Sequence, residues 1–192
     1  MWDRLVRIAA PAETPVSLAE AKAHLRVDSS EDDTLIGGLL ASATAYFDGP
    51  NGIGLALCTQ TWEVRLDVFP CGPICIPIGP VASITSLKYF DPDGVEQTWA
   101  GSNYESDLTA PARVRPLAGG AWPAIRDKLA AVTLRFVVGQ SAADVPADLK
   151  AAVLLVIGHL YANREAVAPA AMSELPMAVQ SIVNRHWVGR VQ

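Results

Sequence analysis

The spacing of apolar residues changes twice along this chain, near Gln60 and again near Pro146. Before the first change and after the second, apolar residues recur about every 3.6 residues, as they do in a helix with one buried face. Between the two changes they alternate with polar residues, which is typical of strands that bury one side. The sequence therefore predicts an α+β chain, a small helical bundle from N- and C-terminal helices with an antiparallel β insertion in the middle.

Three segments follow from these changes of period. We expect residues 1–57 to supply the N-terminal helices of the bundle and residues 58–140 to form the antiparallel β insertion. Residues 141–192 should supply the C-terminal helices that complete the bundle. Neither pair of terminal helices has enough local partners to bury its own apolar stripe, so the two pairs are expected to pack on each other.

Local signals mark where the helices begin and end. Ser17, with Glu20 three residues later, forms a capping box that predicts the start of a short helix. The stretch "SSEDDTLIGGLLASATAYF" predicts a second helix with Ser30 as its cap, ended by "DGPNG". Pro146 suits the start of a third helix, and a last one is expected at about residues 175–187.

The strands are expected in five short stretches of the middle segment. A tight turn, "DPDG", separates two of them. The long connection "ARVRPLAGGAWPA" should carry Arg113 and Arg115 on a loop, and a loop of this length more often serves binding than core packing. The stretches are "QTWEVRLDVF", "ICIPIG", "ASITSLKYF", "VEQTW" and "AVTLRFVVG".

The stretch "VPADLKAAVLLVIGHLYANRE" could be a membrane anchor, a catalytic helix or a core helix. Its apolar run, residues 151–162, is shorter than the roughly 20 residues that span a bilayer. His159 has no acid or nucleophile at a fixed spacing, so it is expected to be structural. We therefore expect a core helix, with Tyr161, Arg164 and Glu165 at its polar end in reach of a neighbour. The N-terminus lacks the apolar segment of a secretory signal, and we expect a soluble, cytoplasmic chain.

Charge and motifs argue against several classes of function. The formal net charge of −5 is unlike that of proteins that grip nucleic acid. Cys58, Cys71 and Cys75 lack the spacing of a zinc site and are expected to pack as small apolar residues. The sequence holds no Gly-x-Ser-x-Gly, His-Glu-x-x-His or P-loop pattern. We therefore expect no enzyme, with no catalytic residues, no metal and no cofactor.

The C-terminal stretch "NRHWVGRVQ" places Arg185, His186 and Arg190 around Trp187 in an otherwise acidic chain. One interpretation is a helix C-terminus that favours positive charge, with Trp187 in the core. The other is an exposed segment that docks on another protein or faces DNA, since Trp and Arg are enriched at binding hot spots. The residues alone leave both interpretations open.

The order of several short signatures resembles the head–tail connector, or adaptor, proteins of long-tailed phages and of phage-derived gene transfer agents. The resemblance extends from Pro15 to about Arg185. The signatures are "PVSLAEAKAHLRVD", "EDDTLI", "CTQTWEVRLDVFP", "IPIGPVASITSLKYFDPDG", "NYESD", the "WP" at Trp122 and Pro123, and "VPADLKAAVLLVIGHLYANRE".

The resemblance implies a structural subunit that forms a ring on the portal of a particle, extends its DNA channel and docks the next neck or tail protein. Expected partners are the portal protein, a stopper or tail-completion protein, and identical subunits in a ring, taken as a dodecamer. Packaged double-stranded DNA would pass through without sequence-specific binding, and no membrane is involved. The implied location is the particle neck, and the host cytoplasm during assembly.

The resemblance also suggests which residues meet these partners. Residues 175–192 would dock on the portal through Trp187 with Arg185 and Arg190, and His186, Tyr161 and Arg164 are further expected contacts. The β insertion would meet a stopper or the capsid.

Two alternatives remain. One is a stopper or tail-completion protein of the same kind of particle, against which the two long terminal helices count. The other is a small soluble enzyme, which a deep pocket holding His24 or His159 beside a carboxylate would favour.

Overall fold

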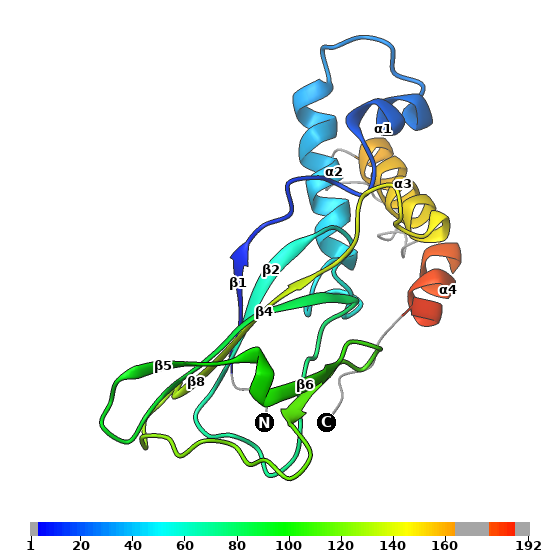
Figure 1. Cartoon of the computed structure of the whole chain (residues 1–192). Helices are drawn as coiled ribbons and strands as arrows, with labels where there is room; N and C mark the ends of the chain where they lie inside the picture. The colour runs from blue at the N-terminus through cyan, green and yellow to red at the C-terminus, as the bar shows by residue number, and fades with distance from the viewer. Residues whose placement is uncertain (1–3, 164–176, 187–192) are drawn as a thin grey trace. The chain divides into compact units, whose positions relative to one another are not determined.

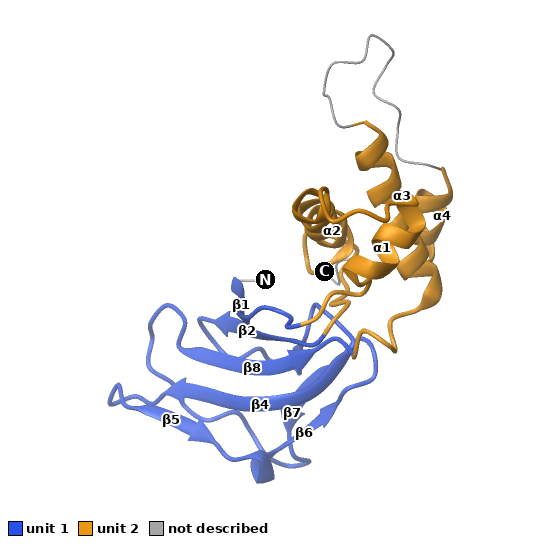
Figure 2. Ribbon diagram, turned by 90° about the horizontal axis from the view of Figure 1, so that it is seen from above, with its two compact units in different colours: residues 1–12, 59–140, 190–192 blue, residues 13–58, 141–189 orange. Residues whose placement is uncertain are grey.

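The computed structural model describes residues 4–163 and 177–186. Trp187, Arg190 and Arg164 therefore lie outside the described residues. The chain forms two compact units, coloured separately in Figure 2. A β unit contains residues 4–12 and 59–140, and a helical unit contains residues 13–58, 141–163 and 177–186. The predicted α+β class is confirmed.

Antiparallel strands build the β unit (Figure 1). One sheet has five strands in the order β1-β2-β8-β4-β5, and a second has three in the order β3-β7-β6. A 3-10 turn, η1 (Gly101–Asn103), precedes β6. The strands are β1 (Arg4–Ala9), β2 (Gln60–Leu66), β3 (Ile74–Cys75), β4 (Val81–Phe90), β5 (Glu96–Trp99), β6 (Tyr104–Asp107), β7 (Arg113–Pro116) and β8 (Val132–Val138).

Alternation along β2 and β8 produces one buried face, as the sequence predicts. Trp62 lies opposite Phe136, and Val64 opposite Leu134. All four side chains are buried. Partners across an antiparallel pair point to the same face, so each pair adds two apolar side chains to the core of the β unit.

Two features of the β unit differ from the expectations. The segment before residue 13, expected among the N-terminal helices, contains strand β1, whose residues pair with β2 from Arg4 opposite Arg65 to Ala9 opposite Thr61. Arg113 and Arg115, expected on a loop, lie on strand β7. Strand β1 depends on a partner that is distant in sequence, and β7 is only four residues long, so periodicity alone gave a weak signal.

Four helices make up the helical unit: α1 (Leu18–Leu25), α2 (Asp33–Phe47), α3 (Ala147–Ala162) and α4 (Met177–His186). The capping box of α1 is present: the Ser17 amide donates to Glu20 Oε2 over 2.7 Å, and the Glu20 amide donates to Ser17 Oγ over 3.2 Å. The cap of α2 is Asp32, and not Ser30 as expected. Asp48, the first residue of the "DGPNG" turn, caps the other end of α2.

Helices from both ends of the chain share one apolar core. From α2 it takes Ile36, Leu40, Ala43 and Phe47, which recur at the helical period. Helix α3 contributes Leu149, Ala152, Val153, Val156 and Ile157, so the apolar run of residues 151–162 belongs to a core helix. Val179 of α4 is 1% exposed. Among the described residues, no helix is long and apolar enough to cross a membrane.

Candidate interaction site

Asp148, in the first turn of α3, contacts two basic side chains in the last turn of α4. His186 Nε2 lies 2.7 Å from Asp148 Oδ2, and Arg185 Nη1 lies 3.4 Å from the same oxygen. The hydrogen bond with His186 is the main cause that lowers the pKa of Asp148 below its ordinary value. Asp148 also lies at a helix N-terminus, where the helix dipole favours a negative charge. The junction therefore holds the C-terminal end of α4 on α3.

Two of the predicted partner residues thus make contacts inside the helical unit. His186 is partly buried and its ring is in the hydrogen bond to Asp148. The side chain of Arg185 remains 67% exposed, so its guanidinium stays accessible to a second molecule. Ile182 and Val183 of the same helix pack against the core. Helix α4 is thus packed on the helical unit and Arg185 is exposed. The two interpretations of this segment differ on Trp187, which lies outside the described residues.

Tyr161 is also engaged within the unit. Its hydroxyl donates to Asp32 Oδ2 over 2.6 Å and links the last turn of α3 to the cap of α2. The expected surface contact of Tyr161 with a neighbour therefore cannot use the hydroxyl proton, which is bonded internally. Sequence reasoning could not detect this bond, because the two residues are 129 positions apart.

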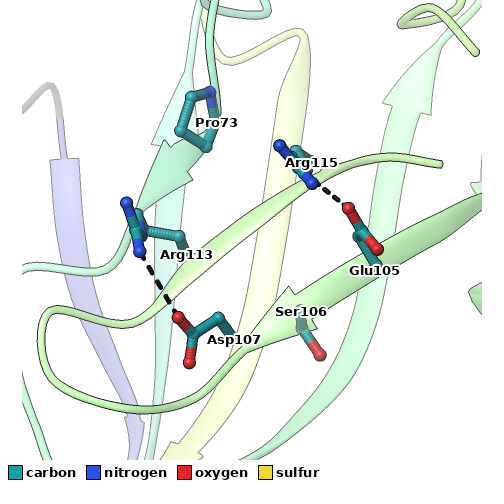
Figure 3. Close-up of a pocket in the computed structure, with 6 residues that line it drawn as sticks. All are labelled: Pro73, Glu105, Ser106, Asp107, Arg113 and Arg115. Atoms are coloured by element: carbon teal, nitrogen blue, oxygen red, sulfur yellow. Dashed lines mark hydrogen bonds and ion pairs between the residues drawn. The ribbon is translucent and has the colours of Figure 1, made fainter. Parts of the chain in front are cut away.

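A polar pocket of about 510 Å³ opens on the three-stranded sheet of the β unit. Figure 3 shows Arg113 turned toward Asp107, and Arg115 toward Glu105, across strands β6 and β7. The distances are 3.4 Å and 2.5 Å. Pro73 and Ser106 complete the lining. Both carboxylates are thus already neutralised by arginine, and the six lining residues include no histidine or cysteine. The arrangement suits a charged contact surface better than acid–base chemistry.

Five aromatic rings form a cluster that no local sequence pattern indicates, because its members come from separate parts of the chain. Phe69 stacks on Trp122 with ring centroids 4.5 Å apart, and Trp99 stacks on Tyr104 at 5.7 Å. Tyr89 lies 6.2 Å from Phe69. Trp122 also donates its indole N–H to the Gly72 carbonyl over 3.2 Å. The cluster fastens the long connection between β7 and β8 to strands of both sheets.

A buried carboxylate, Glu63, lies between two arginines of the larger sheet. Its side chain is 5% exposed, with Arg65 at 3.0 Å and Arg135 at 2.5 Å. Burial raises the pKa of Glu63, but hydrogen bonds from Arg135 and Arg65 outweigh burial, and the net pKa is lowered. Both arginines form ion pairs with this carboxylate, so it stays ionised. Through Arg135 it links β2 to β8.

The histidines and cysteines considered in the sequence analysis are dispersed. The His24 ring lies beside Gly158 of α3, where an added Cβ would be 3.4 Å from its Nε2. Cys58, Cys71 and Cys75 are free thiols, and only Cys58 is buried, so the expectation that they pack as small apolar residues is wrong for the exposed Cys71. Within the described part of the chain, no group of three or more His, Cys, Asp and Glu side chains could hold a metal ion.

Comparison with known proteins identifies similar chains. Residues 15–76 match the family model of the phage gp6-like head-tail connector protein. This match confirms the resemblance predicted from the sequence. No curated protein sequence matches the chain.

Similar chains also occur in solved structures of gene transfer agent (GTA) particles. A chain of the virion of the native GTA particle is 27% identical, with a TM-score of 0.79. Chains from the neck of the empty particle with C6 symmetry and of the native particle with C12 symmetry are 28% and 29% identical, with TM-scores of 0.78 and 0.75. In all three comparisons 98% of this chain and 97% of the other chain are covered.

Proposed function

We propose that this chain, which matches the head-tail connector family over residues 15–76, is a structural adaptor subunit in the neck of a phage or gene-transfer-agent particle. The observation that carries the proposal is the likeness to chains of GTA necks over nearly the whole length of both partners. The similarity includes the β unit and the helical unit, so both parts belong to the proposed neck subunit.

In this proposal identical subunits form a ring. Closed rings are built from heterologous interfaces, in which one face of a subunit meets a different face of the next. The similar chains come from necks with C12 and C6 symmetry. A ring of twelve also obeys sixfold symmetry, so both symmetries are compatible with a dodecamer. Packaged double-stranded DNA would pass through the ring. A subunit with a net charge of −5 makes few contacts to the phosphates, and such contacts would slow the passage of the DNA.

The portal protein and a stopper or tail-completion protein are the proposed partners on either side of the ring. The portal contact is assigned to the C-terminal segment, through Trp187 and Arg190 together with Arg185. The exposed guanidinium of Arg185 supports this assignment. His186, Tyr161 and Arg164 are proposed at the margin of the same contact, with His186 and Tyr161 contributing ring edges while they keep their internal hydrogen bonds.

The proposed role requires no catalysis. The similar chains are parts of virion and neck structures, and the carboxylates of the charged pocket are paired with arginines. We place the protein in the particle neck after assembly and in the host cytoplasm before it.

The test is the mass of the purified chain, measured by light scattering over a wide concentration range, alone and with the portal protein of the same source. A closed oligomer, or a monomer that joins the portal at a fixed ratio, is expected. A strict monomer that ignores the portal would contradict the proposal.

The portal contact has its own test. Replacing Trp187 and Arg190 together with Ala should abolish portal binding and leave the melting temperature unchanged. Arg113→Ala with Arg115→Ala, a matched double change in the β unit, should leave portal binding intact. A collapse of stability in the first variant would place Trp187 in the core and refute its docking role.

A further inference from the structure

The outward face of α2 is unusual because it is exposed and carries no charge. No charged residue occurs between Asp33 and Asp48. Leu35 is 39% exposed and Tyr46 is 45% exposed, at opposite ends of this face. We call it the α2 outer face; its exposed residues are Thr34, Leu35, Gly38, Ala41, Ser42, Ala45 and Tyr46.

The fold of a single subunit does not explain this composition. The inward face of α2 already supplies its share of the core through Ile36, Leu40, Ala43 and Phe47. A helix at the surface of an isolated protein normally presents charged and polar side chains to water, whereas a helix that is apolar all round is normally buried. The core of a protein interface is likewise depleted of charge.

The adjacent glycines of α2 also indicate that a neighbouring molecule covers this helix. Adjacent glycines in a helix interior weaken the helix, because glycine loses more backbone freedom than alanine on folding. A Cβ added to Gly37 or Gly38 would meet nothing within 4 Å. By contrast, a Cβ on Gly52 would collide with the backbone of Phe47, so the subunit itself requires that glycine. Space at Gly37 and Gly38 is open in the subunit, and a closely packed neighbour would account for both.

We infer that the α2 outer face is a ring contact, covered in the assembled neck by a second copy of this chain. The inference rests on the proposed function, because cyclic symmetry requires each subunit to bury surface against two copies. Charge favours a second copy over DNA as the occupant of this face. Each copy carries a net charge of −5, so copies approach most favourably through a face without charge, whereas DNA would need a basic one.

A charge placed in the contact tests the inference. Ala41→Glu adds a carboxylate in the middle of the α2 outer face, and Ala23→Glu adds the same charge at an exposed position of α1 as the matched control. Each variant is compared with the wild type by light scattering, alone and on the portal. We expect Ala41→Glu to raise the concentration for half-assembly at least tenfold and to leave incomplete rings on the portal. The control should assemble like the wild type.

A second variant separates assembly from folding. Gly38→Ala should raise the melting temperature of the unassembled subunit, because alanine favours the helix and finds open space there. The same change should weaken the ring, so the two readouts move in opposite directions. Circular dichroism checks that Ala41→Glu remains folded.

Three results would overturn the inference. Normal rings from both α2 variants would show that no copy covers this face, and would leave the proposed function standing. Complete rings that no longer bind the portal would assign the face to the portal. A wild-type chain that never assembles, alone or on the portal, would refute both the inference and the proposed function.

Discussion

The Tyr161 hydroxyl donates a hydrogen bond of 2.6 Å to the carboxylate of Asp32, the residue that caps α2. Next to it, Lys22 Nζ lies 2.6 Å from Asp33 Oδ1. The start of α2 is thus a junction where α1, α2 and the end of α3 are held together. The junction orients α2, whose outward face we assign to the ring contact.

Tyr161→Phe should destabilise the helical unit without changing its fold. The variant keeps the ring and removes the donor, and a hydrogen bond to a charged acceptor contributes about 1.5–3 kcal/mol when buried. Because both residues are only partly buried, we expect a loss of about 1 kcal/mol in the free energy of unfolding, measured by urea denaturation. A variant as stable as the wild type would show that the bond does not contribute.

The stability of the α3–α4 junction should fall in acid. The pKa of Asp148 is lowered in the folded chain, so folding favours its ionised form. The resulting stabilisation is fully present above the unfolded pKa, about 3.9, and is lost as the pH falls through the lower folded pKa. Asp148→Asn should therefore be less stable than the wild type at pH 7, and the difference should shrink toward pH 2. Thermal melts across this range measure it, and a difference independent of pH would contradict the assignment.

An aspartate should destabilise the chain more at the fully buried Val156 of α3 than at the partly buried Leu39 of α2. Val156 is 3% exposed in the core, whereas Leu39 is only partly buried against it. An aspartate at position 156 would bury an unpaired charge, so Val156→Asp is expected to unfold the chain. Leu39→Asp should be milder, since its carboxylate can reach water. Circular dichroism of the two purified variants distinguishes them, and equal damage would contradict the ranking.

The three thiols should react at different rates. Burial, followed by the nearby charges of Glu13 and Asp48, raises the pKa of Cys58 to about 11, and the thiolate is the reactive form. Cys71 is exposed and Cys75 is intermediate. At pH 8 a thiol reagent should therefore label Cys71 rapidly and Cys58 only after denaturation. Peptide mapping after timed labelling identifies the sites, and rapid labelling of Cys58 in the native chain would contradict its burial.

Much of the secondary structure could be predicted because it depends on neighbours in sequence. The Ser17–Glu20 capping box forms across three residues, and the apolar period of α2 and α3 reports directly which side of each helix is buried. The alternation in β2 and β8 predicted their buried face in the same way. The resemblance to the connector family rests instead on short sequence signatures and their order along the chain.

The pairing of strands and of charged side chains depended on contacts between distant parts of the chain. Strand β1 is ordered by β2, and Asp148 is held by His186 across 38 positions. Neither pairing leaves a local pattern.

The sequence by itself determined the periods, the caps and the α+β class, because these follow from backbone preferences and apolar spacing over a few residues. Only the tertiary structure decided which apolar residues of α2 are inside. Ile36 and Leu35 look alike in the sequence, but packing in the core of the helical unit covers the first and leaves the second 39% exposed. Burial is a property of the assembled core, and it is this difference that marks the α2 outer face as a contact surface.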